Sequence, residues 1–208
     1  MNSRLERLFE KVDWSAPAKR DSELIDDPRF EGLFQACGGL TAFQGGLRVF
    51  GPQDGELCSF ERWNDAASWR TEYRRLAAGL EFFAEDFLGN QFAFDGEFVV
   101  EFMAETGERI PFATSFLEWL ERILANPDDE LSLWLLNAWI SNQRLSRNDH
   151  LCPKIPFIMG GVSSVENLYA LNRVKSMVFK GSIAVQIDGL PSGTPIRLNV
   201  SRSGNDTQ

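Results

Sequence analysis

The first part of the chain alternates between short helical patterns and glycine-rich breaks. Apolar residues at helical spacing predict a helix over residues 1–13, and Asp26-Asp27-Pro28 opens a second helix that Gly38-Gly39 should end. Residues 40–50 read as strand material interrupted by two glycines. A third helix is expected over residues 66–78, where large apolar side chains recur every three or four positions. Helices and strands are therefore mixed from the start of the chain.

The centre of the chain has the pattern of an antiparallel meander. Asp95-Gly96 is a strong signal for a two-residue hairpin, and Thr106-Gly107 supplies a further turn. Alternation along residues 91–103 should divide the phenylalanines between the two faces of the sheet. The predicted strands are short runs of aromatic or β-branched residues, at 80–84, 91–94, 97–103 and 109–112.

Two helices should follow the meander. Ser115-Phe116-Leu117-Glu118 matches a capping box, and the apolar stripe behind it predicts a helix over 116–124 that packs on the sheet. Asn126-Pro127 ends that helix. Asp128 or Asp129 then caps another helix, which continues to about Gln143 and is apolar nearly all round. This second helix should be buried or form an interface.

The rest of the chain is expected to form a small extension. Residues 141–151 are polar and read as a linker, and residues 154–200 read as strand, loop, short helix and strand. We therefore predict an α+β fold, a mainly antiparallel sheet flanked by helices, with a small C-terminal α/β extension. The predicted parts are a domain over 1–143, the extension over 144–200, packed on or beside it, and a disordered tail over 201–208.

Cysteine usage and hydropathy favour a soluble protein of the cytoplasm. The three cysteines are an odd number, far apart in sequence, and a chain of 208 residues can fold on its own core without disulfides. The N-terminus is charged and amphipathic and has no signal-peptide pattern. No run approaches the 18 or so apolar residues of a membrane span.

Charge is distributed unevenly along the chain. The net charge is −9, but residues 81–130 hold thirteen acidic side chains and only two arginines, a local charge of −11. Residues 151–202 have the opposite excess, +4, because six basic side chains face two acidic ones. An acidic surface repels phosphate backbones, so we expect no nucleic-acid binding, whereas a basic protein partner fits. The alternative is that these acids only solvate the surface.

The sequence offers few groups for catalysis. His150 is the only histidine; it lies in a polar segment two residues from Cys152, without the spacing of a zinc site, and we expect it to be exposed. A nucleophilic triad would need this imidazole, and no nucleophile-elbow pattern accompanies it. The glycine pairs lack the context of a nucleotide loop. Adjacent acids such as Glu85 and Asp86 keep a two-carboxylate hydrolase as an alternative. We expect no catalytic residue, metal or cofactor.

Residues 83–95, Phe83-Ala84-Glu85-Asp86-Phe87-Leu88-Gly89-Asn90-Gln91-Phe92-Ala93-Phe94-Asp95, resemble the central signature of the SUKH superfamily, which includes the yeast Smi/Knr cell-wall regulators and many bacterial immunity proteins. The strand Val99–Phe102 and the entry to the helix at Ser115 are also similar to that family. The resemblance covers about Glu23 to Leu124 and departs from the usual pattern at Phe87-Leu88, where small residues are commoner. Within the signature, Asp86, Gly89 and Asn90 have local backbone reasons to form a turn.

The resemblance implies a SUKH-like fold and binding without catalysis, because its bacterial members include immunity proteins for secreted toxins, many of them nucleases. A basic toxin domain would be the protein partner, held through the acidic surface of residues 81–130. The candidate contact residues are Glu85, Asp95, Glu97, Glu101, Glu105 and Glu108. The alternatives are a regulatory scaffold resembling the yeast members, and an unrecognised hydrolase. The sequence leaves the oligomeric state and the identity of a toxin open.

Overall fold

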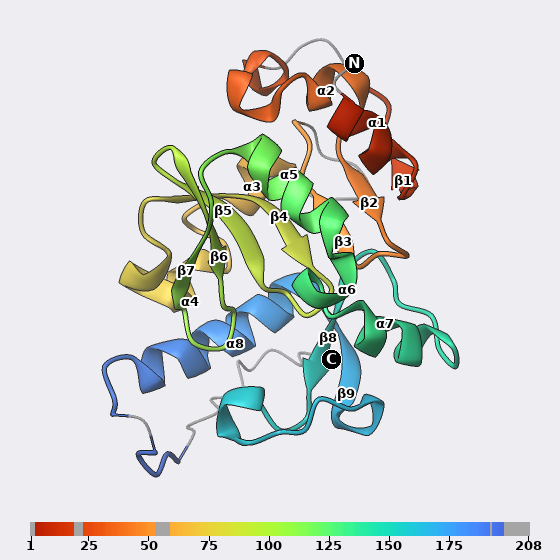
Figure 1. Ribbon diagram of the computed structural model, residues 1–208. Helices are drawn as coiled ribbons and strands as arrows, with labels where there is room; N and C mark the ends of the chain where they lie inside the picture. Colours follow the sequence, from red (N-terminus) through yellow and green to blue (C-terminus); the bar gives the residue numbers. More distant parts are fainter. Residues whose placement is uncertain (1–2, 19–22, 53–58, 192, 198–208) are drawn as a thin grey trace, which may run out of the picture.

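A computed structural model describes residues 3–18, 23–52, 59–191 and 193–197. Its main sheet contains seven strands, all antiparallel to their neighbours and arranged in chain order (Figure 1). The strands are β1 (Val12–Ser15), β2 (Leu40–Ala42), β3 (Leu47–Val49), β4 (Leu80–Asp86), β5 (Gln91–Asp95), β6 (Phe98–Phe102) and β7 (Arg109–Ala113). The predicted α+β class and mainly antiparallel sheet are confirmed.

The predicted hairpin at Asp95-Gly96 joins β5 and β6. Asp95 pairs with Phe98 at its mouth, and Gly96 has φ +66°, a conformation that favours glycine. Irregularities in the pairing lie between Phe82 and Ala84 and between Val99 and Val100. Because side chains alternate along each strand, such a bulge changes which face the following residues occupy.

One face of the sheet packs against helices from both halves of the chain. Phe30, Phe83, Phe94, Phe116 and Trp119 form a buried aromatic group there, with ring centroids from 4.7 to 6.0 Å apart in its tilted and edge-on pairs. The helices on this side are α1 (Ser3–Phe9), α2 (Leu33–Ala36), α5 (Phe116–Ala125), α6 (Pro127–Glu130) and α7 (Leu133–Ile140), with short 3-10 turns at Glu23–Asp26 and Pro28–Phe30.

The predicted start of α5, with Ser115 as its N-cap, is confirmed. Ser115 is the N-cap, and its hydroxyl accepts a hydrogen bond from the Glu118 backbone N–H at 3.2 Å. The Glu118 carboxylate in turn accepts from the Thr114 backbone N–H at 2.7 Å. The Ser115 hydroxyl thus satisfies one donor that the helix N-terminus leaves free, whereas Glu118 binds Thr114, one residue before the N-cap, in place of the Ser115 N–H that a capping box predicts.

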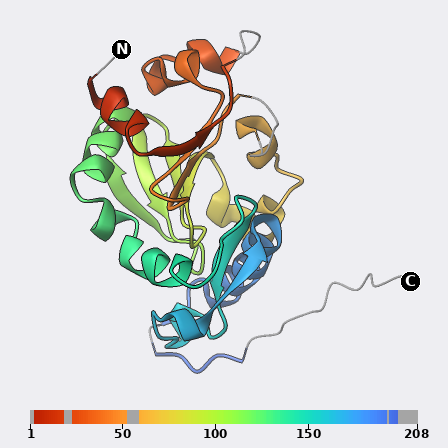
Figure 2. The ribbon, with the colours of Figure 1, turned by 90° about the vertical axis from the view of Figure 1, so that its right-hand side faces the viewer.

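The other face is covered by α3 (Phe60–Trp63), α4 (Arg70–Tyr73), a 3-10 turn at Arg74–Ala77, and α8 (Arg173–Ile187). A second buried core forms here, including Trp63, Trp69, Tyr73, Phe102 and Met177. Figure 2 shows the sheet between its two helical layers. The core on this face therefore draws on both the predicted domain and the predicted extension.

Three predicted helices are each divided in the structure. The stretch from Asp26 breaks at Glu31 (φ +50°), and residues 66–78 break into α4 and a 3-10 turn at Arg74 (φ +50°). The helix predicted from Asp128 to Gln143 divides at Ser132 (φ +51°) into α6 and α7. A left-handed residue cannot continue an α-helix, and apolar spacing alone does not report it.

The extension differs most from the prediction. The last residues of the linker expected over 141–151 form the start of β8 (Asp149–Pro153), which pairs with β9 (Leu168–Asn172) in a second sheet. Between these strands lie 3-10 turns at Phe157–Met159 and Val165–Asn167. The expected short helix is α8, fifteen residues long, and no strand follows it within the described residues to 197. Gly181 in α8 allows this helix to pack closely against α4, because a Cβ at this position would lie 2.9 Å from the Tyr73 ring. The predicted tail, 201–208, lies outside the described residues.

No helix in the described ranges is long and apolar enough to cross a bilayer.

Candidate functional site

A buried carboxylate lies at the centre of the molecule. Glu85, near the end of β4, is 0% exposed, and its Oε1 accepts hydrogen bonds from Arg48 Nη1 at 3.3 Å and Arg173 Nη1 at 3.1 Å. Gln91 Nε2 donates to its Oε2 at 3.1 Å. Arg48 comes from β3 and Arg173 from the start of α8. Two guanidinium groups from distant segments thus compensate one buried negative charge.

His150 completes this group, which we call the Glu85 network: Arg48, Glu85, Gln91, His150 and Arg173. His150 lies in β8 and is 0% exposed, so the expectation of an exposed histidine is wrong. Its Nε2 lies 3.1 Å from Glu85 Oε2, although the angle leaves Nε2 without a formed hydrogen bond. The physical reason is that β8 is bonded to the segment after β4, where Leu151 N–H donates to the Phe87 carbonyl at 2.9 Å, so this part of the expected linker lies against the sheet.

The other nitrogen of His150 meets a hydroxyl. His150 Nδ1 lies 3.1 Å from Ser176 Oγ, and Ser176 Oγ lies 2.9 Å from Cys152 Sγ. The order carboxylate, imidazole, hydroxyl is that of a nucleophilic triad. Glu85, His150 and Ser176 are each 0% exposed, so in this conformation the hydroxyl cannot touch a substrate. The arrangement acts as a buried polar network that joins β8 and α8 to the sheet.

Burial and charge set the ionisation of these groups. Burial lowers the pKa of His150 to about 4, against the opposing effect of Glu85 and with the help of Lys180 and Arg48. Burial by itself raises the pKa of Glu85, but positive charge from protonated His150, Arg173 and Arg48 outweighs it and holds that pKa well below its usual range. At neutral pH the network therefore consists of a carboxylate, two guanidinium groups and a neutral imidazole.

The turn between β4 and β5 lies directly against the network. Asp86 accepts two hydrogen bonds from Asn90, from its backbone N–H and from Nδ2, each at 2.9 Å, and Gly89 has φ +87°. Asn90 Oδ1 accepts from the Ala104 N–H at 3.1 Å. Gln91 Nε2 donates to the Gly89 carbonyl at 2.9 Å. Asp86, Gly89 and Asn90 thus make backbone contacts that shape the turn.

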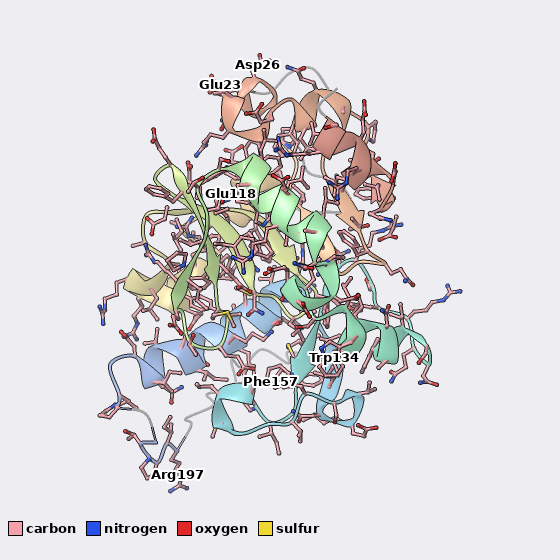
Figure 3. All side chains as sticks on the ribbon, in the orientation of Figure 1. Glu23, Asp26, Glu118, Trp134, Phe157 and Arg197 are labelled. Carbon is pink, nitrogen blue, oxygen red and sulfur yellow. The ribbon has the colours of Figure 1, made fainter. Side chains whose placement is uncertain are left out.

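A groove of about 440 Å³ opens beside this turn, and we call it the Trp134 groove. Its walls come from the β4–β5 turn, the β6–β7 turn, α7 and the segment after β8. Figure 3 shows Trp134 on α7 beside Phe157. The lining residues include Leu88, Asn90, Met103, Glu105, Trp134, Phe157, Ile158 and Lys180. Apolar walls with a few polar groups are typical of a binding site.

Carboxylates near the groove have pKa values raised by burial. Burial raises the pKa of Asp86 to about 6 against hydrogen bonds from Asn90 and the charge of Lys180. Burial, together with Asp86 and Glu130, raises the pKa of Glu101 to about 7. Burial also raises the pKa of Glu105, whose Oε2 accepts from the Ile158 N–H at 2.9 Å.

Within the described ranges no three His, Cys, Asp or Glu side chains gather as metal ligands.

The structure does not bring the six candidate contact residues together. Glu85 is buried, so its assignment to a contact surface is corrected: the Glu85 network takes up its charge. Glu101 is half-buried; its neighbour Val99, two positions away on β6, belongs to the core under α5. Asp95 and Glu97 lie at the β5–β6 hairpin, and Glu105 and Glu108 lie in the turn at the other end of β6. Strand alternation and strand length separate them.

Sequence reasoning missed the residues that build this site. Arg48, Arg173 and Trp134 were not singled out, and His150 was assigned to a linker. The one available signal was the apolar helix expected from Asp128 or Asp129 to about Gln143, which should be buried or form an interface. In α7 the side chains of Leu133, Leu135, Leu136 and Trp139 are buried, whereas Trp134 is exposed.

Replacing Gly89 by alanine should destabilise the fold more than the same change at Gly45. Both glycines have positive φ, +87° and +84°, so both variants bear the same conformational cost. A Cβ on Gly89 would lie 2.6 Å from His150 Nδ1, whereas nothing lies within 4 Å of one on Gly45. We expect the free energy of unfolding, measured in urea, to fall by about 1–3 kcal/mol more for Gly89→Ala than for Gly45→Ala. Equal losses would show that the turn does not pack on the histidine.

The single histidine permits a direct titration of the network. With a pKa near 4, the imidazole resonances should stay constant between about pH 8 and about pH 5.5 in NMR spectra of the folded protein. Because the unfolded pKa is near 6.5, the unfolded chain takes up this proton first, so the contribution of His150 to stability should be lost as the pH drops from 6.5 towards 4. Asp86 and Glu101 act in the opposite direction over this range because their folded-state pKa values are raised, so the contribution of His150 is read from the imidazole resonances. A folded-state midpoint near 6.5 would mean that the imidazole is in water.

Comparison with known proteins adds the fold alone. No family model matches the chain, and no curated protein matches it. Among solved structures, the chain is similar to the crystal structure of Atu4351 from Agrobacterium tumefaciens, with a TM-score of 0.56 and 14% sequence identity. The match covers 85% of this chain and 87% of the other. The mixed α+β architecture is thus one that a crystal structure also contains.

Proposed function

We propose that this chain is a non-catalytic protein-binding module whose contact surface is centred on the Trp134 groove. The observation that carries the proposal is an exposed apolar surface. Trp134 is 55% exposed and Ile158 47%, both in the groove, and Met159 and Leu190 are also exposed. Folded proteins seldom leave such side chains together in water unless something binds there.

The apolar surface continues past the groove. Ile158 also lines a second hollow of about 390 Å³, whose walls include Met159, Leu190 and Pro191. The two hollows therefore share a wall, and the surface extends from α7 to the segment after α8. A partially exposed tryptophan in such a surface is the kind of residue that contributes most to protein–protein affinity.

Acidic groups around the groove favour a basic partner. Glu105 is a wall of the groove, Glu108 is exposed in the same turn, and Asp128 and Asp129 are exposed in α6, just before α7. Opposite charge accelerates encounter and aligns two surfaces. The acidic contact region is thus proposed to lie around the β6–β7 turn and α6, with Asp95 and Glu97 at a distance from it.

The partner we propose is a basic toxin domain, such as a nuclease, which the chain binds and neutralises as an immunity protein. The resemblance of residues 83–95 to the SUKH signature supports this, and the same residues form the turn that walls the groove. The sealed position of Glu85, His150 and Ser176 supports a binding role over hydrolysis. Such a protein would act in the cytoplasm of the cell that makes the toxin.

The test is co-expression with the product of the adjacent gene, with cell growth as the readout. Growth should be rescued by the wild-type chain, and Trp134→Ala should weaken the purified complex about 30-fold or more in titration calorimetry, because a buried anchor contributes about 2 kcal/mol or more. The matched control is Phe98→Ala, since Phe98 is 61% exposed but lies on β6 at the hairpin. Equal affinities for the two variants would remove the groove as the contact site, and failure of rescue would count against the immunity role.

A further inference from the structure

The two sheets differ in how their edges are protected. β7 is an edge of the main sheet, and it carries the exposed Pro111, which has no N–H to offer another strand. In the small sheet β8 is the one partner of β9 among the described residues, and Leu151 on β8 donates its N–H to the Phe87 carbonyl at 2.9 Å. β8 is thus joined to the main sheet and β9 is left with an outer edge.

Hydrogen bonds at both ends of the hairpin establish which groups of β9 point outward. Lys154 N–H donates to the Asn167 carbonyl at 2.6 Å, and Arg173 N–H donates to the Asn148 carbonyl at 2.9 Å. In an antiparallel pair bonded residues alternate, so Leu168, Ala170 and Asn172 direct their backbone groups away from β8. The Ala170 N–H and C=O make no hydrogen bond within the described part of the chain, and Ala170 is exposed.

A groove of about 460 Å³ runs along this edge. Its walls include Leu168, Tyr169 and Ala170 on β9, Trp139 near the end of α7, and Arg144 in the segment after α7. Successive strand residues point to opposite faces, so three consecutive residues can line one groove only if it follows the strand edge. The unpaired backbone of Ala170 therefore borders a space that can hold an extended chain.

The charge of this groove is opposite to that of the molecule. Arg144 and Lys154 are exposed in its wall, against the single acid Glu166, whereas the whole chain has net charge −9. If a second copy of this chain paired through β9, its own Arg144 and Lys154 would come close to those of the first copy. Repulsion between these like charges opposes such a dimer. An acidic segment from another protein would neutralise them.

We propose that the outer edge of β9 binds an extended, acidic segment of a partner protein as an added strand. Ala170 N–H and C=O would exchange hydrogen bonds with the backbone of that segment, and alternate acidic side chains would lie near Arg144 and Lys154. This surface is separate from the Trp134 groove, so the two proposals can fail independently.

The probe is a fluorescent synthetic peptide in which valine and glutamate alternate, with binding followed by fluorescence anisotropy. The wild-type chain should bind it at least about tenfold more tightly than the matched valine–lysine peptide, and the advantage should shrink in high salt. N-methylation of all the peptide nitrogens should abolish binding, because strand addition needs the N–H groups of one peptide edge and methylation of alternate nitrogens would leave the other edge free. The proposal would be overturned if the methylated peptide or the lysine peptide bound as tightly as the glutamate peptide. It would also be overturned if the glutamate peptide did not bind.

Variants of the chain give an independent readout. Ala170→Pro removes an outward N–H without breaking a hydrogen bond to β8 and should reduce affinity about tenfold or more, whereas Ala170→Ser keeps that N–H and should bind as wild type. If Ala170→Pro does not fold, the methylated peptide on the wild-type chain still decides the matter. A dimer of the wild-type chain in analytical ultracentrifugation that Ala170→Pro dissociates would assign the edge to a second copy and overturn the proposal.

Discussion

The structure depends on compensating the charge of Glu85. A carboxylate with no access to water costs several kcal/mol unless cations and hydrogen bonds replace its hydration. Here Arg48, Arg173 and Gln91 donate to it, and His150 lies beside it. Arg48 and Glu85 come from the main sheet, but Arg173 and His150 come from α8 and β8. Side chains from the C-terminal part of the chain therefore help to compensate a buried charge of the main sheet.

The same network holds the walls of the Trp134 groove. Gln91 bonds both Glu85 and the Gly89 carbonyl, Gly89 lies against the His150 ring, and Lys180 on α8 donates to the Leu88 carbonyl. These bonds fix the β4–β5 turn, one side of the groove. A binding surface with preformed walls loses less conformational entropy when a partner binds. The buried Glu85 network thereby holds a wall of the Trp134 groove in place before a partner binds.

Local features of the fold were predictable from the sequence, and long-range ones were not. Asp95-Gly96 and the Ser115 cap act through neighbouring residues, so their signals can be recognised in a short window. Glu85 has partners 37 and 88 residues away, and nothing in its neighbourhood distinguishes it from an exposed acid of the same strand such as Glu81. The length of α8 was missed because its buried residues, such as Met177 and Lys180, follow no simple apolar stripe. Trp134 lay in a helix apolar on all sides, where spacing cannot select the exposed face.

A double-mutant cycle on Glu85 and Arg173 tests the central claim most directly. Unfolding free energies in urea would be measured for wild type, Glu85→Gln, Arg173→Met and the double variant. Each single change should cost roughly 3–5 kcal/mol because it leaves buried charge uncompensated, and the double change should cost at least about 2 kcal/mol less than the sum. Additivity within about 0.5 kcal/mol would contradict the account, because it would mean that the buried carboxylate does not couple the C-terminal segment to the sheet.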